Sequence, residues 1–196
     1  DAFPFAPPPP PPPTDDTAAL QAAIDTAAAA DDECVLAPGT YSVSASLRLP
    51  DHAYVRGRGR VVIKLLPLTN KSIFVNADQV NGNIALQLKN LICDADVANQ
   101  RQVSVTDAYS VLRFNRVTGA VFEDIEALGG YRHGVYPAVS SLGEGLELVR
   151  CERVVVREGY FHDNRYDGLK IRGGEHILVN NLRAAVMTLQ SWSEDI

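Results

Sequence analysis

The sequence is poor in the features that define several large classes of protein. Its three cysteines, Cys34, Cys93 and Cys151, are too few and too scattered for a disulfide framework or a zinc site. We expect them to be buried as small apolar side chains. No stretch approaches the roughly 18 apolar residues of a transmembrane helix, so no membrane insertion is expected. The formal net charge of −6 argues against general nucleic-acid binding, which needs a basic surface.

What is present indicates one folded domain behind an unusual leader. Of 196 residues, 46% are hydrophobic and only 7% aromatic, which is enough for an aliphatic core. Eight of the twelve prolines lie in the first 13 residues, seven of them as the run Pro7–Pro13. Such a run favours an exposed polyproline II rod. We therefore expect residues 1–13 to be a proline-rich linker, either a stiff spacer or a segment that docks to another protein, and residues 14–196 to form the domain.

One helix is expected directly after the proline run, within residues 14–32. The sequence Thr14-Asp15-Asp16-Thr17 supplies N-cap residues and negative charge for the positive end of a helix dipole. Ala18–Ala30 follows, with Leu20, Ile24 and Ala27 along one face. The stretch is rich in alanine, so the helix can pack closely against the elements that follow.

From Cys34 onward the sequence consists of short β-type runs broken by Gly, Asn and Asp, with no helical segments between them. Four segments align with one another, 86–96, 120–130, 154–164 and 177–187, at offsets of 34, 34 and 23 residues. Their apolar columns read Leu88, Phe122, Val156 and Val179; Leu91, Ile125, Gly159 and Leu182; Cys93, Ala127, Phe161 and Ala184. A polar column reads Asn90, Asp124, Glu158 and Asn181, and we interpret it as a structural ladder.

This pattern predicts an all-β fold, a parallel β-helix in which residues 33–196 form the coils and the helix caps the open N-terminal end. Each coil supplies short strands, and like residues stack on like. An open end would expose both core and unpaired strand edges, which a capping helix can cover. The alternative is an antiparallel sandwich, for which Asn81-Gly82 is the one tight hairpin signal.

Several segments resemble the pectate-lyase-like right-handed parallel β-helix superfamily, which includes polysaccharide lyases, hydrolases, alginate C5-epimerases and phage tailspikes. The matching segments are Thr14–Asp25, Leu36–Tyr41, Val55–Gly59 and Val62–Lys64. His162–Gly168 is similar to the catalytic module of alginate epimerases. The resemblance covers about residues 14–185 and implies a right-handed solenoid with a substrate groove along the outer face of stacked coils.

The sequence departs from this superfamily at two places. Members usually carry a Gly-Asp-Gly-rich loop ahead of the Thr-Asp-Asp-Thr segment, where this chain has the proline run. Epimerases carry an Asp-Pro-His-Glu catalytic motif, and the corresponding stretch here is Tyr136-Pro137-Ala138-Val139. The epimerase motif is therefore not intact, and the sequence leaves open whether the protein is an enzyme.

The repeat register gathers polar residues along one side of the coils. Asp94 aligns with His162, Asp96 aligns with Gly130 and Asn164, and Arg132 and Tyr166 share the next column. The candidate catalytic residues are His162, Asp163, Asp167, His133 and Tyr136. The candidate substrate-binding residues are Asp94, Asp96, Arg132, Tyr166, Lys170 and Arg172, and Asp94 and Asp96 are also candidate ligands of Ca²⁺, the one cofactor considered.

These residue types suit chemistry on a uronic acid. A His, Tyr or Lys base would remove the C5 proton, and cations or Ca²⁺ would stabilise the enolate, as in β-elimination or epimerisation. Paired carboxylates could instead serve a hydrolase. The same residues are also common as solvated turns at β-helix corners. Arg56, Arg58 and Arg60 alternate with glycine and are either contacts to an anionic sugar chain or exposed turn residues.

We therefore expect a protein that binds an acidic polysaccharide and cleaves or epimerises it, outside the cell or on a virion or cell surface. One alternative is a non-catalytic structural or adhesive module such as a phage tailspike or cell-surface fibre component, assembled as a homotrimer or larger. Another is a glycoside hydrolase that acts through paired aspartates.

Overall fold

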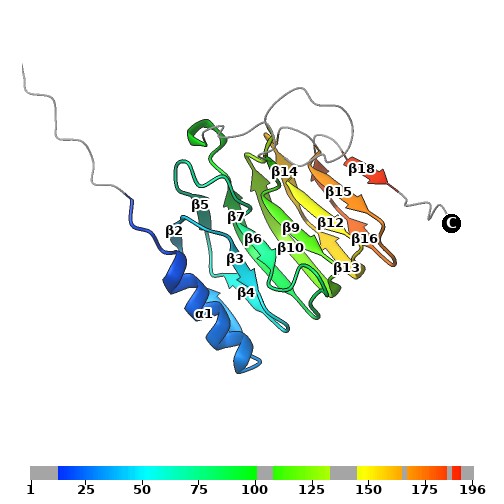
Figure 1. The fold of residues 1–196 in the computed structure, drawn as a ribbon, viewed down its shortest axis with the longest axis horizontal. Coiled ribbons are helices and arrows are strands. Elements are labelled where there is room, and N and C mark those ends of the chain that lie inside the picture. Colours follow the sequence, from blue (N-terminus) through cyan, green and yellow to red (C-terminus); the bar gives the residue numbers. More distant parts are fainter. Residues whose placement is uncertain (1–12, 101–107, 133–144, 165–166, 185–186, 191–196) are drawn as a thin grey trace, which may run out of the picture.

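In a computed structural model of the protein, residues 13–100, 108–132, 145–164, 167–184 and 187–190 are described, and they form a parallel β-helix with one helix at its N-terminal end (Figure 1). The parallel β-helix predicted from the sequence is confirmed. The capping helix, α1 (Thr17–Ala29), lies where it is expected. Within the described residues, no helix is long and apolar enough to cross a bilayer.

The strands build two parallel sheets. The first row of the ten-stranded sheet consists of β1 (Glu33–Leu36), β4 (Tyr54–Gly57), β7 (Gln87–Asp94), β10 (Thr118–Leu128), β13 (Glu152–Arg157) and β16 (Leu178–Asn180). The second row consists of β2 (Gly39–Val43), β5 (Val61–Leu65), the C-terminal halves of β7 and β10, β14 (Tyr160–His162) and β17 (Arg183–Ala184). The six-stranded sheet takes one strand from each of six coils: β3 (Leu47–Leu49), β6 (Phe74–Asn76), β9 (Leu112–Asn115), β12 (Leu146–Val149), β15 (Leu169–Arg172) and β18 (Met187–Gln190).

Two minor elements interrupt this pattern. A short 3₁₀ turn, η1 (Val97–Asn99), follows β7, and β8 (Ala108–Tyr109) pairs with β11 (Tyr131–Arg132) as an antiparallel ribbon. The hairpin considered at Asn81-Gly82 is not formed, because this turn joins β6 to β7, which belong to different parallel sheets.

The apolar columns predicted from the repeats are confirmed by strand register. Leu88 pairs with Phe122, Phe122 with Val156, and Val156 with Val179. Cys93, Ala127, Phe161 and Ala184 form a second continuous column. The inward residues of the central coils are almost completely buried, and the three cysteines are free and buried, as expected. The core is therefore a stack of aliphatic side chains with a few aromatics, such as Phe114 and Phe122, whose ring centroids lie 4.7 Å apart.

The polar column Asn90, Asp124, Glu158 and Asn181 lies at the bend between the two rows of the large sheet. All four residues have left-handed backbone conformations, with φ between 49° and 54°. Asn90 also donates from Nδ2 to the backbone oxygens of Gly57 (2.8 Å) and Gly59 (3.2 Å) on the preceding coil. Asn and Asp tolerate this conformation better than most residues, which explains their place in the column. These residues turn the chain at each coil, which is a structural role.

Helix α1 closes the N-terminal end by bonding to the backbone of edge strands. Leu20 and Ile24 are buried against the first coil. The Gln21 amide donates to the Arg48 oxygen and accepts from the Arg48 nitrogen, both at 2.8 Å, so it replaces a neighbouring strand for β3. Asp16, the N-cap residue, makes no side-chain cap bond to the helix; its carboxylate instead accepts from Ser42 N of β2 (2.9 Å). The Thr14–Thr17 segment therefore ties the helix to the coils as well as starting it.

Candidate functional site

The outer face of the second row carries two parallel columns of side chains. One column reads Thr40, Val62, Ile92, Glu126, Tyr160 and Arg183, and the other reads Ser42, Lys64, Asp94, Leu128 and His162. The predicted alignment of Asp94 with His162 is confirmed, with Leu128 between them. Because successive strands lie about 4.8 Å apart, the four residues from Val62 to Tyr160 span about 14 Å along the axis.

His162 is the centre of a hydrogen-bonded group on this face. Its Nε2 lies 3.1 Å from Glu126 Oε1, and its Nδ1 lies 2.8 Å from Asp163 Oδ2. Its ring stacks on that of Tyr160, with centroids 4.1 Å apart. The ring of His162 is therefore held by carboxylates on both nitrogens and by an aromatic face. Tyr160 is 47% exposed and the side chain of Asp163 is 79% exposed, so this group is open to a ligand.

The electrostatics of the group favour the charged form of His162. Burial alone lowers the pKa of His162, but hydrogen bonds and charge attraction from Asp163 and Glu126 outweigh it, so the pKa lies above its usual value. An imidazolium can donate from both nitrogens, which fits two carboxylate neighbours. The contacts thus favour the protonated ring, in which both nitrogens donate to carboxylates.

Asp94 and Asp96, the candidate Ca²⁺ ligands, already have a cation between them. Lys64 Nζ lies 3.5 Å from Asp94 Oδ2 and 3.3 Å from Asp96 Oδ1. Asn99 Nδ2 donates to both oxygens of Asp96, and Asp94 Oδ1 accepts from Asp96 N. Among the described residues, no group of three or more His, Cys, Asp or Glu side chains could hold a metal ion. These two carboxylates are satisfied by protein donors, and the pair does not fit a resident Ca²⁺.

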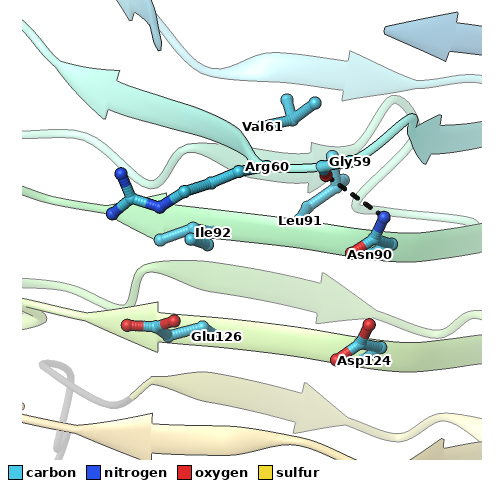
Figure 2. A pocket seen from close by; sticks show the side chains of 8 residues that line it. All are labelled: Gly59, Arg60, Val61, Asn90, Leu91, Ile92, Asp124 and Glu126. Atoms are coloured by element: carbon cyan, nitrogen blue, oxygen red, sulfur yellow. Dashed lines mark hydrogen bonds between the residues drawn. The ribbon is translucent and has the colours of Figure 1, made fainter. Parts of the chain in front are cut away.

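A pocket of about 320 Å³ opens at the bend of the same face (Figure 2). Its lining residues come from the start of β5, from β7 and from β10: Gly59, Arg60, Val61, Asn90, Leu91, Ile92, Asp124 and Glu126. In Figure 2, Arg60 and Glu126 lie on opposite sides of Ile92. Glu126 belongs to both the pocket and the His162 group, so the two are parts of one surface.

Two other predicted binding residues, Lys170 and Arg172, lie on the six-stranded sheet in β15 and not in the outward columns of the second row. Lys170 is buried and stands beside Glu147, which is 0% exposed. Glu147 lies 3.2 Å from an Arg172 NH2 group and 3.3 Å from Arg113 Nε, and it accepts from Ser110 Oγ. Arg172 thus compensates the buried negative charge of Glu147. A buried carboxylate without a cationic partner would strongly destabilise the fold.

The remaining sequence candidates are placed as follows. His133, Tyr136 and Tyr166 lie outside the described residues. Arg132 is described only in its backbone, where it pairs with Ala108. Asp167 is half-buried, and its backbone oxygen accepts from Gly145 N (3.1 Å). The structure thus gathers His162, Asp163, Asp94 and Asp96 on one face, and it gives no contact that joins the others to them.

Three residues of this face, Glu126, Tyr160 and Lys64, are not among those predicted from the sequence. Glu126 and Tyr160 stand two positions before Leu128 and His162, so the two-residue alternation of a strand places them on the same outer face. That alternation is the signal that would have found them. Lys64 precedes all four aligned segments, so no repeat match connects it with Asp94.

The fold and this face together define a parallel β-helix protein that displays carboxylate, imidazole and aromatic side chains across successive coils. The sequence pattern of the family described as "Rhamnogalacturonase A/epimerase, pectate lyase-like" matches residues 13–185. The chain belongs to this family, and the predicted membership of the pectate-lyase-like superfamily is confirmed.

Solved structures with a similar fold come from a bacteriophage and a bacterium. The pre-mature gene product 12 of bacteriophage phi29 has a TM-score of 0.60 at 18% identity over 87% of this chain and 27% of its own. An N-terminal fragment of the same protein gives 0.50 at 19% identity over 86% and 32%. The A-module of mannuronan C-5 epimerase AlgE4 from Azotobacter vinelandii gives 0.45 at 17% identity over 87% and 73%. The chain thus spans about a third or less of the phage structures, and no curated protein sequence matches it.

Proposed function

We propose that this protein binds a polysaccharide along the outer face of the second row, from the pocket at Arg60 to Tyr160 and His162. The observation that carries the proposal is the exposed Tyr160 ring, stacked on a histidine that two carboxylates hold. Sugar rings bind proteins through flat apolar contacts and hydroxyl hydrogen bonds, and an aromatic face beside carboxylate acceptors offers both. Family membership supports the same ligand class.

An acidic polysaccharide suits the cations on this face. Arg60 lines the pocket at one end, and Arg183 stands next to Tyr160 at the other end, both exposed. Arginine forks bind carboxylates through paired hydrogen bonds. The chain would then run along the axis, with its hydroxyls directed to Glu126 and Asp163 and its anionic groups directed to the arginines.

The chemistry that the geometry supports best is acid–base hydrolysis of a glycosidic bond. Charged His162 would give its Nδ1 proton to the leaving glycosidic oxygen, while Glu126 holds Nε2. The Asp163 carboxylate, displaced from Nδ1 by the substrate, would take a proton from the water that forms the new C–O bond. Asp163, on an exposed turn, can move away from Nδ1 when substrate arrives. β-Elimination or epimerisation would need a neutral base to remove the C5 proton, whereas the two carboxylates bonded to the ring nitrogens of His162 favour its charged form.

The experiment is to incubate the purified protein with polygalacturonate, alginate and bacterial capsular polysaccharides, with and without Ca²⁺. New reducing ends without ultraviolet-absorbing ends would support hydrolysis, and unsaturated ends would support elimination. The variants His162→Gln and Asp163→Asn are expected to lose turnover while keeping the circular dichroism spectrum of the wild type. Full turnover by the double variant would refute the assignment of this site.

A second candidate is a non-catalytic binding or fibre module. The stretch Tyr136-Pro137-Ala138-Val139 favours it, because this stretch lacks the acid and the histidine of the epimerase motif. In this case the protein would bind glycan without releasing products. This proposal includes three further features. The protein would act at a virion or cell surface or outside the cell, it would assemble as a homotrimer or larger, and residues 1–13 would dock to another protein. Multi-angle light scattering checks the assembly, and a monomeric mass would count against the trimer.

A further inference from the structure

The pocket at the bend carries opposite charges on its two sides. Arg60 contributes a cation on one side, and Asp124 and Glu126 contribute carboxylates on the other (Figure 2). Ile92, half-buried, lies between them in register with Glu126 and forms an apolar floor with Val61 and Leu91, which also line the pocket. A ligand that fits must be anionic at one edge and a hydrogen-bond donor at the other.

Arg60 is free to bind such an anion. Two nearby cations are already paired: Arg56 bonds through Nε and an NH2 group to Glu33 (2.5 and 2.6 Å), and Lys64 pairs with Asp94 and Asp96. Within the described part of the chain, Arg60 makes no ion pair, and its side chain is exposed along the pocket. Its guanidinium is therefore a charged donor group without a carboxylate partner among these residues.

The acidic side of the pocket accepts hydrogen bonds but cannot donate them when ionised. Asp124 and Glu126 come from the same strand, β10, two residues apart. The amide nitrogen of Asn90 is already used by Gly57 and Gly59. Carboxylates next to an apolar floor suit the hydroxyl groups of a sugar ring, which donate to them.

We infer that this pocket is a subsite for a uronic acid residue, and that Arg60 is its specificity-determining residue by pairing with the sugar carboxylate while Asp124 and Glu126 receive the ring hydroxyls. The inference rests on the proposed glycan-binding function and assigns its anion recognition to one residue. It also places the uronate two strands from Tyr160 along the axis, since Ile92, Glu126 and Tyr160 follow one another in one column.

The test compares Arg60→Gln with Arg58→Gln, since Arg58 is also exposed and lies two residues away but does not line the pocket. Binding of oligogalacturonate and oligomannuronate, each with a carboxyl-reduced neutral counterpart, is measured by isothermal titration calorimetry at two salt concentrations. Arg60→Gln is expected to weaken binding of at least one acidic oligosaccharide by about tenfold or more, the usual effect of losing a charge-assisted hydrogen bond, and to leave the neutral counterpart unchanged. Arg58→Gln is expected to change neither by more than about twofold.

Equal effects of the two substitutions, or equal wild-type affinity for the acidic and neutral forms, would overturn the role of Arg60. Tyr160→Ala separates this outcome from failure of the proposed function. If Tyr160→Ala weakens the binding of both forms and Arg60→Gln weakens the binding of neither, glycan binding is supported and the uronate subsite is refuted. If Arg60→Gln weakens the binding of the acidic form and Tyr160→Ala has no effect, the uronate subsite is supported and the binding face through His162 is refuted. If the wild type binds neither form, both proposals fall.

Discussion

At the scale of single residues, the environment of His162 makes a prediction about pH. Glu126 and Asp163 together raise its pKa against the opposing effect of burial. A raised pKa in the folded state means that the imidazolium stabilises the fold at pH values below the unfolded pKa of about 6.5, and that this contribution is lost as the pH rises through the folded pKa. Glu126→Gln and Asp163→Asn are each expected to lower the pKa of His162, measured by NMR titration of its ring protons.

Asp163→Asn and Glu126→Gln have a matched control in Asp51→Asn. Asp51 bonds to Asn83 and to Ile84 N at another corner of the coil and has no contact with His162. This control is expected to leave the His162 titration unchanged. A His162 pKa that stays above its usual value after both carboxylates are removed would show that Glu126 and Asp163 do not cause the shift.

A second residue-scale prediction concerns Asn90, because substitutions can separate the effect of its left-handed backbone conformation from the effect of its side-chain hydrogen bonds. Asn90→Gly keeps access to a positive φ but loses the two bonds to Gly57 and Gly59, whereas Asn90→Ala loses both advantages. Each lost hydrogen bond costs about 1 kcal/mol, and a left-handed alanine costs about another 1 kcal/mol. The free energy of unfolding in urea should therefore fall more for Asn90→Ala than for Asn90→Gly.

Equal losses for the two Asn90 variants would show that backbone conformation is unimportant at this corner. Gly57 gives independent support for the close approach of these two coils. A Cβ added to Gly57 would collide with the backbone oxygen of Asn90, so Gly57→Ala is expected to destabilise the same bend.

At the scale of elements, α1 functions as a substitute for a missing strand. Gln21→Ala removes both hydrogen bonds to the Arg48 backbone and leaves an edge donor and acceptor of β3 without that partner. We expect a loss of about 1–3 kcal/mol in the free energy of unfolding. Gln21→Glu keeps an acceptor for Arg48 N but cannot donate, so its loss should be intermediate. Wild-type stability of Gln21→Ala would show that the helix caps the end by apolar contact alone.

The junction between α1 and β2 is expected to weaken in acid. Bonds from Ser44 Oγ and then from Thr17 lower the pKa of Asp15 from 3.8 to about 2. Because the folded pKa is depressed, this stabilisation is complete above pH 3.8 and is lost as the pH falls through about 2. The stability difference between wild type and Asp15→Asn should shrink across that window in an acid-unfolding series.

Two serines provide the control for the Asp15 experiment. Ser44→Ala removes the main cause of the lowered pKa, whereas Ser42 contributes its backbone to Asp16 and not its side chain. Ser44→Ala should therefore reduce the acid sensitivity and Ser42→Ala should not. The same pH dependence in wild type and Ser44→Ala would refute the role of this hydrogen bond.

At the scale of the whole molecule, the repeats carry most of what the sequence could predict. Columns such as Cys93, Ala127, Phe161 and Ala184 repeat in chemical type, so the amino-acid sequence is enough to reveal the stacking of coils. The same register predicted that Asp94 and His162 share a column. The pairing of Lys64 with Asp94 could not be predicted in this way, because Lys64 lies before the aligned segments. The burial of Lys170 beside Glu147 could not be predicted either, because it depends on how neighbouring strands of the six-stranded sheet pack.

The first and last coils that the structure describes differ in burial, and hydrogen exchange should detect the difference. At the N-terminal end, Gln21 and Asp16 bond to backbone groups of β3 and β2, Thr17 bonds to Ser44 N directly after β2, and Leu20 and Ile24 cover the core. At the other end, the residues of β16 and β17 are half-buried or exposed, including Leu178 at 58%.

In stacked coils, the stability of each coil depends on its contacts with neighbouring coils. Amides of the 196-residue chain should therefore exchange slowest in β7 and β10, at an intermediate rate in β2 and β3, and fastest in β16 and β17. Uniform exchange along the axis, or faster exchange in β3 than in β16, would contradict a stabilising role for the cap, and Gln21→Ala should accelerate exchange in β3 while leaving β16 unchanged.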